Sequence, residues 1–284
     1  MPYFLCSVMH DAARSAGVEV VNYALTEGLE FITLPSLEED DALLYVDYFG
    51  LKTAYIKSAL VERYREGLIV DNSQALFSAP VDGIVSLYSP RKFVGVPDGG
   101  LLVNAPANMD RPTATHSASR FDALMGRLSD GPEAHYPDFL EGEHSLGLEG
   151  VRGMSRATYR LLDSIDYASV RNKRMENFSQ LHKALSAFNA ASWIPDEPCA
   201  VLCYPLLMRD AAHASGLRDA LREERIFVPC YWREVLDNAA SPTLERDLCA
   251  RLLPLPLDQR YGTEEVDRMT ALIRNYYATQ VEAR

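Results

Sequence analysis

The sequence lacks the patterns of a membrane or secreted protein. No uninterrupted apolar stretch approaches the roughly 20 residues of a membrane-spanning helix. The first residues also lack a basic segment followed by an apolar one, which a secretory leader would show. We therefore expect a cytoplasmic protein.

Excess positive charge is missing too, because the 284 residues carry a formal net charge of −12. Nucleic acids and anionic membranes favour a basic surface, so neither is the expected partner. A small-molecule or protein partner is the better expectation. Hydrophobic residues make up 48% of the chain, which is enough for one large domain and a smaller one.

Motifs for metals, dinucleotides and hydrolases are absent as well. The cysteines are odd in number without C-x-x-C spacing, the histidines are scattered singly, and no Gly-x-Gly-x-x-Gly follows a strand. No metal site is predicted. Cys199 and Cys203 flank a strand-like run, so we expect buried free thiols rather than a disulfide. The five cysteines are Cys6, Cys199, Cys203, Cys230 and Cys249.

What the first half does contain is an alternation of short apolar runs with helical patterns. This alternation is typical of an α/β protein with a mainly parallel sheet. The helical spacing of apolar residues predicts helices over 10–16 and 53–65. The apolar runs predict strands over 3–6, 18–25, 43–46, 68–70, 84–88 and 101–104.

The remainder divides into a polar stretch, a helical link and a second domain. The polar stretch 105–150 is predicted to form a loop and short helices over the active-site side. The stretch 151–188 is predicted to be a long helical segment that links the domains. We expect a large domain over 1–165 and a smaller one over 166–284. The second domain should contain strands at 200–204 and 226–228 and helices at 211–224 and 264–277.

Two polar residues at strand ends suggest a specific chemistry. Asp71 directly follows the run at 68–70, and Lys92 lies 21 residues later, at a turn between two apolar runs. A pyridoxal phosphate site needs a lysine that loses its proton to form a Schiff base, and partial burial favours the neutral amine. It also needs a carboxylate that keeps the pyridine nitrogen protonated. Alternatively, Asp71 caps a helix and Lys92 is a solvated loop lysine.

Several segments resemble the DegT/DnrJ family of pyridoxal phosphate-dependent sugar aminotransferases, within the fold-type I superfamily. The likeness covers nearly the whole chain. It implies a fold-type I aminotransferase-like large domain and a small α+β C-terminal domain. The segments that carry it are 70–75, 85–93, 97–100, 172–178, 226–232 and 255–261.

The resemblance also implies roles for four residues. Lys92 would be the Schiff-base lysine, and Asp71 would be the partner of the pyridine nitrogen of pyridoxal 5′-phosphate. Gln74 would approach the ring hydroxyl. Ser89 would place a hydroxyl near the cofactor phosphate.

One departure from the family pattern concerns the phosphate. The family's large domain opens with a Gly-Thr/Ser-x-Ala-Leu turn into a helix whose N-terminus holds that group. This sequence contains no such segment, so we expect a large domain that is truncated at its N-terminus. At the position of the aromatic residue that stacks on the cofactor ring, the nearest match is Cys6, with Tyr3 and Phe4 close by.

The expected function is therefore transamination. The resemblance implies a small-molecule amino donor, a keto sugar carried on a nucleotide, a role in polysaccharide or natural-product biosynthesis, and a homodimer that completes the site. Lys92 favours transamination over the dehydration that some relatives perform. Two alternatives stay open: a degenerate, non-catalytic relative that acts as a binding or scaffolding protein, or a fragment of a longer enzyme.

Overall fold

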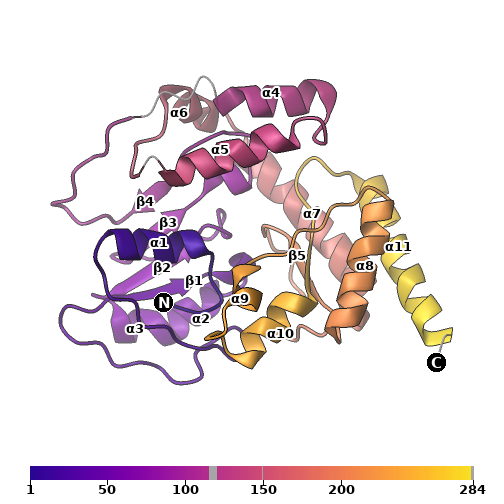
Figure 1. Ribbon diagram of the computed structural model, residues 1–284, viewed down its shortest axis with the longest axis horizontal. Coiled ribbons are helices and arrows are strands. Elements are labelled where there is room, and N and C mark those ends of the chain that lie inside the picture. The colour runs from indigo at the N-terminus through magenta and orange to yellow at the C-terminus, as the bar shows by residue number, and fades with distance from the viewer. Residues whose placement is uncertain (115–119, 149, 283–284) are drawn as a thin grey trace.

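The computed structural model describes residues 1–114, 120–148 and 150–282 and has the α/β architecture that the sequence predicts (Figure 1). Its main sheet has the strand order β1-β2-β3-β4. The strands span Leu43–Val46, Leu68–Asn72, Val85–Tyr88 and Leu101–Val103. The first three strands are parallel and β4 is antiparallel to β3, which confirms a mainly parallel sheet.

Continuous apolar runs explain the position of the central strands. All four residues of β1 are buried, as expected for a strand with both faces covered. The predicted helix over 53–65 is present as three consecutive segments, of which the middle one is a π-helix. They are α2 (Thr53–Tyr55), the π-helix Ile56–Leu60 and α3 (Val61–Tyr64). Gly67 follows at a place where a Cβ atom would lie 2.9 Å from the carbonyl oxygen of Asp41.

Four helices connect the sheet to the rest of the chain. They are α4 (Phe121–Asp130), α5 (Tyr136–Leu148), α6 (Arg156–Asp163) and α7 (Tyr167–Leu185). The predicted helical stretch over 151–188 is thus two helices. The break occurs because the Asp166 side chain accepts a hydrogen bond from the Ser169 N–H and starts α7 as its N-cap.

The C-terminal part forms around a second, antiparallel sheet (orange to yellow in Figure 1). Its strands are β5 (Tyr204–Leu207) and β6 (Leu252–Leu255). The helices are α8 (Ala211–Glu223), α9 (Glu234–Asp237), α10 (Thr243–Arg251) and α11 (Thr263–Glu282). A small α+β part therefore follows the large sheet, as expected.

The N-terminal strands were predicted wrongly. Residues 3–6 bend and form no strand, and within 18–25 only Tyr23 and Leu25 form isolated bridges, to Pro2 and Phe31. Pro2 has no N–H to extend a ladder. The predicted helix over 10–16 is present as α1 (Ser7–Ser15), which begins three residues earlier.

Two strands of the C-terminal part were also misplaced. The strand predicted at 200–204 begins only at Tyr204, because the carbonyls of Val201 and Leu202 accept hydrogen bonds from the buried Arg174 instead of from a neighbouring strand. Residues 226–228 form a loop, and β5 pairs with β6 instead.

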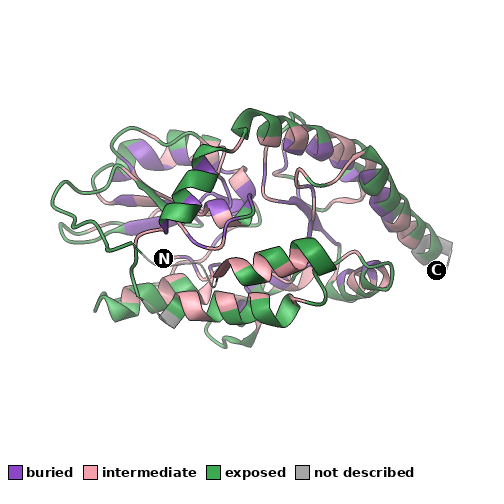
Figure 2. Ribbon diagram, turned by 90° about the horizontal axis from the view of Figure 1, so that it is seen from above, coloured by how far each residue is buried: buried purple, intermediate pink, exposed green. Residues whose placement is uncertain are grey.

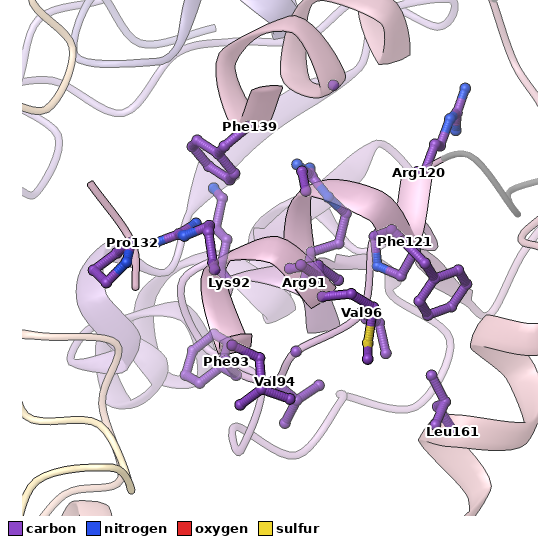
Figure 3. Close-up of a pocket in the computed structure, with 18 of the residues that line it drawn as sticks. Arg91, Lys92, Phe93, Val94, Val96, Arg120, Phe121, Pro132, Phe139 and Leu161 are labelled. Carbon is purple, nitrogen blue, oxygen red and sulfur yellow. The ribbon is translucent and has the colours of Figure 1, made fainter. Parts of the chain in front are cut away.

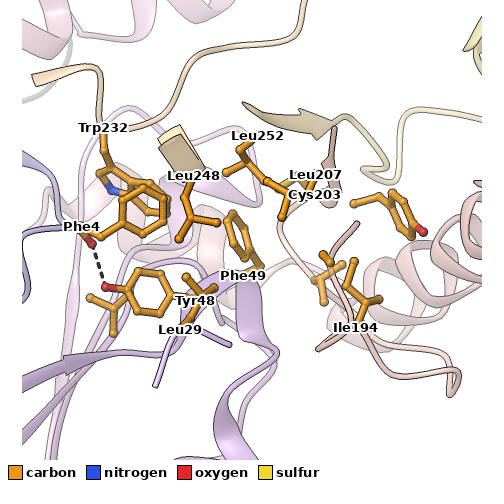
Figure 4. Close-up of a cluster of buried hydrophobic side chains, with 14 of the residues drawn as sticks. Phe4, Leu29, Tyr48, Phe49, Ile194, Cys203, Leu207, Trp232, Leu248 and Leu252 are labelled. Carbon is orange, nitrogen blue, oxygen red and sulfur yellow. Dashed lines mark hydrogen bonds between the residues drawn. The ribbon is translucent and has the colours of Figure 1, made fainter. Parts of the chain in front are cut away.

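One hydrophobic core extends through both parts of the chain (Figure 2). At their junction, the Trp232 ring lies 4.3 Å from that of Phe4, measured between centroids (Figure 4). The Tyr48 hydroxyl donates a 2.8 Å hydrogen bond to the Phe4 carbonyl there. The contact between sheet and C-terminal part is therefore built from large aromatic side chains. Within the described ranges, no helix combines the length and apolar character needed to cross a membrane.

Candidate functional site

The two residues on which the sequence argument depends lie at the same edge of the main sheet. Asp71 belongs to β2, pairs with Val46 of β1 and Leu87 of β3, and is 5% exposed. Lys92 is the last residue of the 3-10 turn Pro90–Lys92, and one residue, Ser89, separates this turn from the end of β3. Parallel strands carry their C-terminal ends to one edge, which is where open α/β sheets bind their ligands.

Asp71 is followed by a turn rather than by the helix that the capping alternative would need. Its Oδ1 accepts a 2.8 Å hydrogen bond from the Ser73 N–H, which fixes the carboxylate at the strand end. This buried carboxylate also attracts the Lys92 ammonium. Asp71 and Lys92 therefore interact electrostatically, as a paired site requires.

Lys92 is an exposed residue that borders a cavity (Figure 3). Desolvation by nearby protein atoms lowers the pKa of its ammonium. The Asp71 carboxylate and the Cys6 thiol act in the opposite direction, to a smaller extent. The result is a lysine whose neutral, nucleophilic form is favoured relative to a solvated loop lysine.

The turn that carries Lys92 is fixed from both ends. The Pro90 carbonyl accepts hydrogen bonds from the N–H groups of Phe93 and Val94, at 2.8 and 2.9 Å. The Phe93 carbonyl accepts two more, from Arg174 Nη2 at 3.2 Å and Gln259 Nε2 at 2.9 Å. The backbone next to Lys92 is thus clamped by two side chains from distant parts of the sequence.

Arg174 is the central residue of this clamp. It lies on α7, is 1% exposed, and its guanidinium carbon lies 4.7 Å from the centroid of the Phe93 ring. It also donates to Gln259 Oε1 at 3.1 Å. Desolvation lowers the Arg174 pKa to about 10. A planar guanidinium with several fixed bonds positions its neighbours more rigidly than a lysine could.

The other predicted site residues lie nearby in different roles. Gln74 is 5% exposed, and its Oε1 accepts a 3.1 Å hydrogen bond from the Phe49 N–H. Ser89 is half-buried, and its carbonyl accepts from the Lys92 N–H at 3.2 Å. Cys6 is half-buried at the start of α1 and close enough to Lys92 to influence its pKa.

The cavity has a volume of about 750 Å³. Its floor is the segment 91–97, and residues of α4 and α5, including Phe121 and Phe139, form another wall (Figure 3). The polar stretch predicted to lie over the active-site side thus contains two helices that border the cavity of Lys92. Such a volume accommodates a ligand of several rings.

Cationic side chains outnumber acidic ones in the cavity lining. Arg91 is ion-paired with Glu143, and Arg260 donates to Asp258 at 2.7 Å. Arg127 lies over the Phe139 ring, at 4.8 Å from its centroid. The six cationic residues are Arg91, Lys92, Arg120, Arg127, Arg174 and Arg260, against the two acids Glu143 and Asp258. In a protein of net charge −12, this local excess of positive charge favours an anionic ligand.

Sequence reasoning missed most of this lining. Arg174 and the segment 258–260 lie in stretches that resemble the family, but their spacing alone gave no indication that they meet Phe93. Their contact depends on how the C-terminal part packs on the sheet. Among residues 1–114, 120–148 and 150–282, no group of three or more His, Cys, Asp or Glu side chains could hold a metal ion.

Neither a family model nor a curated protein sequence matches this chain. Solved structures of sugar aminotransferases do resemble its fold. A DegT DnrJ EryC1 StrS aminotransferase from Brucella abortus is 19% identical, with a TM-score of 0.60 over 97% of this chain and 78% of that one.

Two further structures show the same likeness. DesI, solved in the presence of its TDP-sugar product, is 17% identical with a TM-score of 0.63 over 100% of this chain and 77% of its own. The putative sugar aminotransferase Spr1654 from Streptococcus pneumoniae, in its PMP form, is 11% identical with a TM-score of 0.61 over 98% and 81%. This chain therefore has the fold of the DegT-type sugar aminotransferases.

Proposed function

We propose that this protein is a pyridoxal 5′-phosphate-dependent aminotransferase of the DegT/DnrJ family that acts on a keto sugar carried on a nucleotide. The observation that carries the proposal is that Lys92 and Asp71 lie at one edge of the sheet, where Lys92 borders a cavity. A desolvated lysine and a buried carboxylate are the two groups that the cofactor needs from a protein.

The residues present fit this cofactor. Lys92 is the primary amine that would hold it covalently, and Asp71 would hold a proton on the pyridine nitrogen. Gln74 would offer its amide nitrogen to the ring hydroxyl, because its Oε1 is engaged by Phe49. Ser89 would lie near the phosphate. When bound, the cofactor supplies an electron-withdrawing ring that stabilises negative charge on the substrate carbon.

The chain's own residues then account for proton transfer and positioning. The neutral Lys92 amine is the general base that removes the proton from the substrate carbon and returns it. The Asp71 carboxylate would keep its partner nitrogen protonated. Arg174 and Gln259 hold the backbone of the lysine turn, so that the amine keeps its direction during transfer.

A nucleotide-linked sugar fits the charge of the cavity. The diphosphate of such a substrate is anionic, and arginines bind phosphate through paired N–H donors. Arg91 and Arg127 border the cavity on the side of α5, beside Glu143 and Phe139. DesI, whose structure was solved with a TDP-sugar product, has the same fold.

We also propose a compartment and an oligomeric state for this enzyme. The enzyme acts in the cytoplasm, where nucleotide-linked sugars would be its substrates, in polysaccharide or natural-product biosynthesis. It acts as a homodimer, in which the second subunit completes the binding site.

Trapping the covalent lysine tests the proposal directly. Borohydride reduction of the protein loaded with pyridoxal 5′-phosphate should leave a pyridoxyl group on Lys92, identified by peptide mass mapping. Lys92→Ala should show neither the label nor turnover. The matched control is Lys173→Ala on α7, because Lys173 is half-buried and forms an ion pair with Glu176 at 3.4 Å.

Three outcomes separate the candidate functions. Label on Lys92 with turnover supports the enzyme, whereas label on Lys173 or another lysine contradicts the assignment of Lys92. A folded protein that takes no label in excess cofactor would favour the non-catalytic relative.

A further inference from the structure

The hairpin of helices α4 and α5 borders the cavity of Lys92 without belonging to the hydrophobic core. The two helices pack on each other (Figure 1), and none of their described side chains is buried. Phe121 and Phe139 line the cavity instead (Figure 3). The hairpin therefore forms a wall of the ligand space rather than a layer of the core.

Side chains of the hairpin hold its two helices together. The His135 ring lies between two aspartates, with its Nδ1 2.9 Å from Asp138 Oδ2 and its Nε2 3.0 Å from Asp130 Oδ2. A Cβ atom at Gly126 would lie 2.5 Å from atoms of that ring, so the close approach of the ring to α4 requires a glycine there. The side chains of α5 are thus presented to the cavity by a unit with a defined geometry.

Ion pairs connect the hairpin to the rest of the protein near both ends of α5. In the cavity lining, Glu143 of α5 pairs with Arg91, and at the turn between the helices Glu133 pairs with Arg225 at 3.0 Å. The Arg91 side chain is 23% exposed, whereas that of Arg225 is 75% exposed. Charges with less solvent around them interact more strongly, so the pair in the cavity has the larger effect on its surroundings.

Glu143 places a negative charge among the cationic side chains of the cavity. The lining contains one other acid, Asp258, which is bonded to Arg260 at 2.7 Å. Arg91, the partner of Glu143, precedes Lys92 in the sequence. Desolvation has the largest effect on the Lys92 pKa, and among the smaller effects Arg91 lowers this pKa and Glu143 raises it. The Arg91–Glu143 pair therefore belongs to the electrostatic surroundings of the lysine.

A phosphate group can make the contact with Arg91 that the Glu143 carboxylate makes. Both groups offer oxygens to the paired N–H donors of a guanidinium, but a diphosphate carries more charge and more acceptor oxygens than one carboxylate. The Glu143 side chain is 42% exposed, so water can solvate its carboxylate once it leaves Arg91. An anion of higher charge than a carboxylate can therefore replace Glu143 at Arg91.

We propose that Glu143 is an internal competitor for the diphosphate of a nucleotide: it pairs with Arg91 in the free protein, and the diphosphate displaces it. The choice of a nucleotide as the ligand rests on the proposed function. Exchange of one carboxylate for another at Arg91 gains nothing, whereas a diphosphate brings more charge. Glu143 thus selects a nucleotide over small carboxylates, which include the amino acids that donate amino groups in transamination.

Equilibrium binding of uridine diphosphate to the full-length protein tests this proposal without requiring turnover. Isothermal titration calorimetry compares the parent with Glu143→Gln, which keeps the size of the side chain and removes its charge. We expect Glu143→Gln to bind uridine diphosphate about fivefold more tightly, because the ligand no longer displaces an ion pair. Arg91→Gln should bind it about tenfold more weakly than the parent. Uridine, which has no phosphate, should bind the parent and Glu143→Gln equally.

Glu133→Gln is the matched control. It removes the same charge from the same hairpin and also breaks an ion pair, but Glu133 lies outside the cavity lining. Its affinity for uridine diphosphate should stay within about twofold of the parent. When Arg91→Gln is already present, Glu143→Gln should change the affinity by less than about twofold, because the two residues act through one contact. Circular dichroism spectra establish that all variants are folded.

Three results would overturn the proposal. One is that Glu143→Gln binds uridine diphosphate no more tightly than the parent. Another is that Glu133→Gln gains as much, or that the gain from Glu143→Gln is undiminished when Arg91→Gln is present. The third is that Glu143→Gln changes the retention of pyridoxal 5′-phosphate on dialysis but not the binding of uridine diphosphate, which would make the cofactor phosphate the competing anion.

The borohydride experiment separates this proposal from the proposed function. Label on Lys92 without a gain in Glu143→Gln would overturn the role of Glu143 and leave the aminotransferase assignment intact. The expected gain without label on Lys92 would support the role of Glu143 in a protein that binds nucleotides but is not this enzyme.

Discussion

Two adjacent strands of the main sheet carry an aspartate at or beside their C-terminal end, and the two carboxylates have different surroundings. Asp47 follows β1 and is fully buried, and its carboxylate accepts hydrogen bonds from the Lys52 N–H, Thr53 Oγ1 and Ser78 Oγ at 2.6 to 2.9 Å. Asp71, on β2, accepts from Ser73 and faces Lys92. The first carboxylate is satisfied by three internal hydrogen bonds, whereas the second accepts one from Ser73 and lies close enough to Lys92 to influence its pKa.

The lysines near these two ends differ in the same way. The Lys52 ammonium forms a 2.5 Å ion pair with Glu30 and lies 5.3 Å from the centroid of the Tyr55 ring. Desolvation is the dominant influence on the Lys92 ammonium, and it lowers the pKa of this group. An aspartate and a lysine near a strand end therefore indicate a functional site only where internal partners do not satisfy them.

The largest expected effect is on turnover, in Asp71→Asn. The neutral amide cannot keep the cofactor nitrogen protonated, so kcat should fall by about 100-fold or more. The matched control is Asp47→Asn, whose kcat should stay within about twofold of the parent. Steady-state kinetics with a nucleotide-linked keto sugar measures both. Equal losses in the two variants would remove the distinction between the two strand ends.

A smaller effect is expected on stability, in Asp47→Ala. This change removes a carboxylate that accepts three hydrogen bonds in a fully buried site, so the free energy of unfolding should fall by about 3 kcal/mol. Asp71→Ala removes one such bond and should cost about 1 kcal/mol. Urea denaturation of both variants measures the difference. A greater loss in Asp71→Ala than in Asp47→Ala would contradict the structural role given to Asp47.

The smallest effect is a slope in the pH dependence of stability. Because burial lowers the Lys92 pKa, the folded protein binds fewer protons than the unfolded chain between that pKa and the ordinary value for lysine. Stability should therefore rise with pH across this alkaline window. Lys92→Met should remove that rise, whereas Lys173→Met should keep it. Unfolding free energies from urea denaturation at several pH values would show this, and identical slopes in the parent and Lys92→Met would contradict it.

Local sequence patterns were sufficient where one short segment determines its own structure. The apolar runs placed β1, β2 and β3 to within two residues, because buried parallel strands need such runs on both faces. Lys92 and Asp71 could be singled out because each lies at or beside the end of one of these strands. Their actual roles with a cofactor stay predictions.

Features that depend on distant contacts could not be found in this way. Arg174 displaced the predicted start of β5 by taking the carbonyls of Val201 and Leu202, which no local pattern indicates. The contact of the Cys249 thiol with the Tyr231 carbonyl depends likewise on the packing of α10 against a loop. Sequence reasoning therefore located the centre of the candidate site but not its supports.

The clamp on the Phe93 carbonyl has a consequence for protein synthesis. Its two donors come from residues 81 and 166 positions further along the chain, on Arg174 and Gln259. While the ribosome is still translating the C-terminal part, the sheet can begin to pack, but the turn that carries Lys92 lacks both donors. The lysine turn thus reaches its final geometry only after residue 259 has left the exit tunnel, so the candidate site is among the last parts of this chain to form.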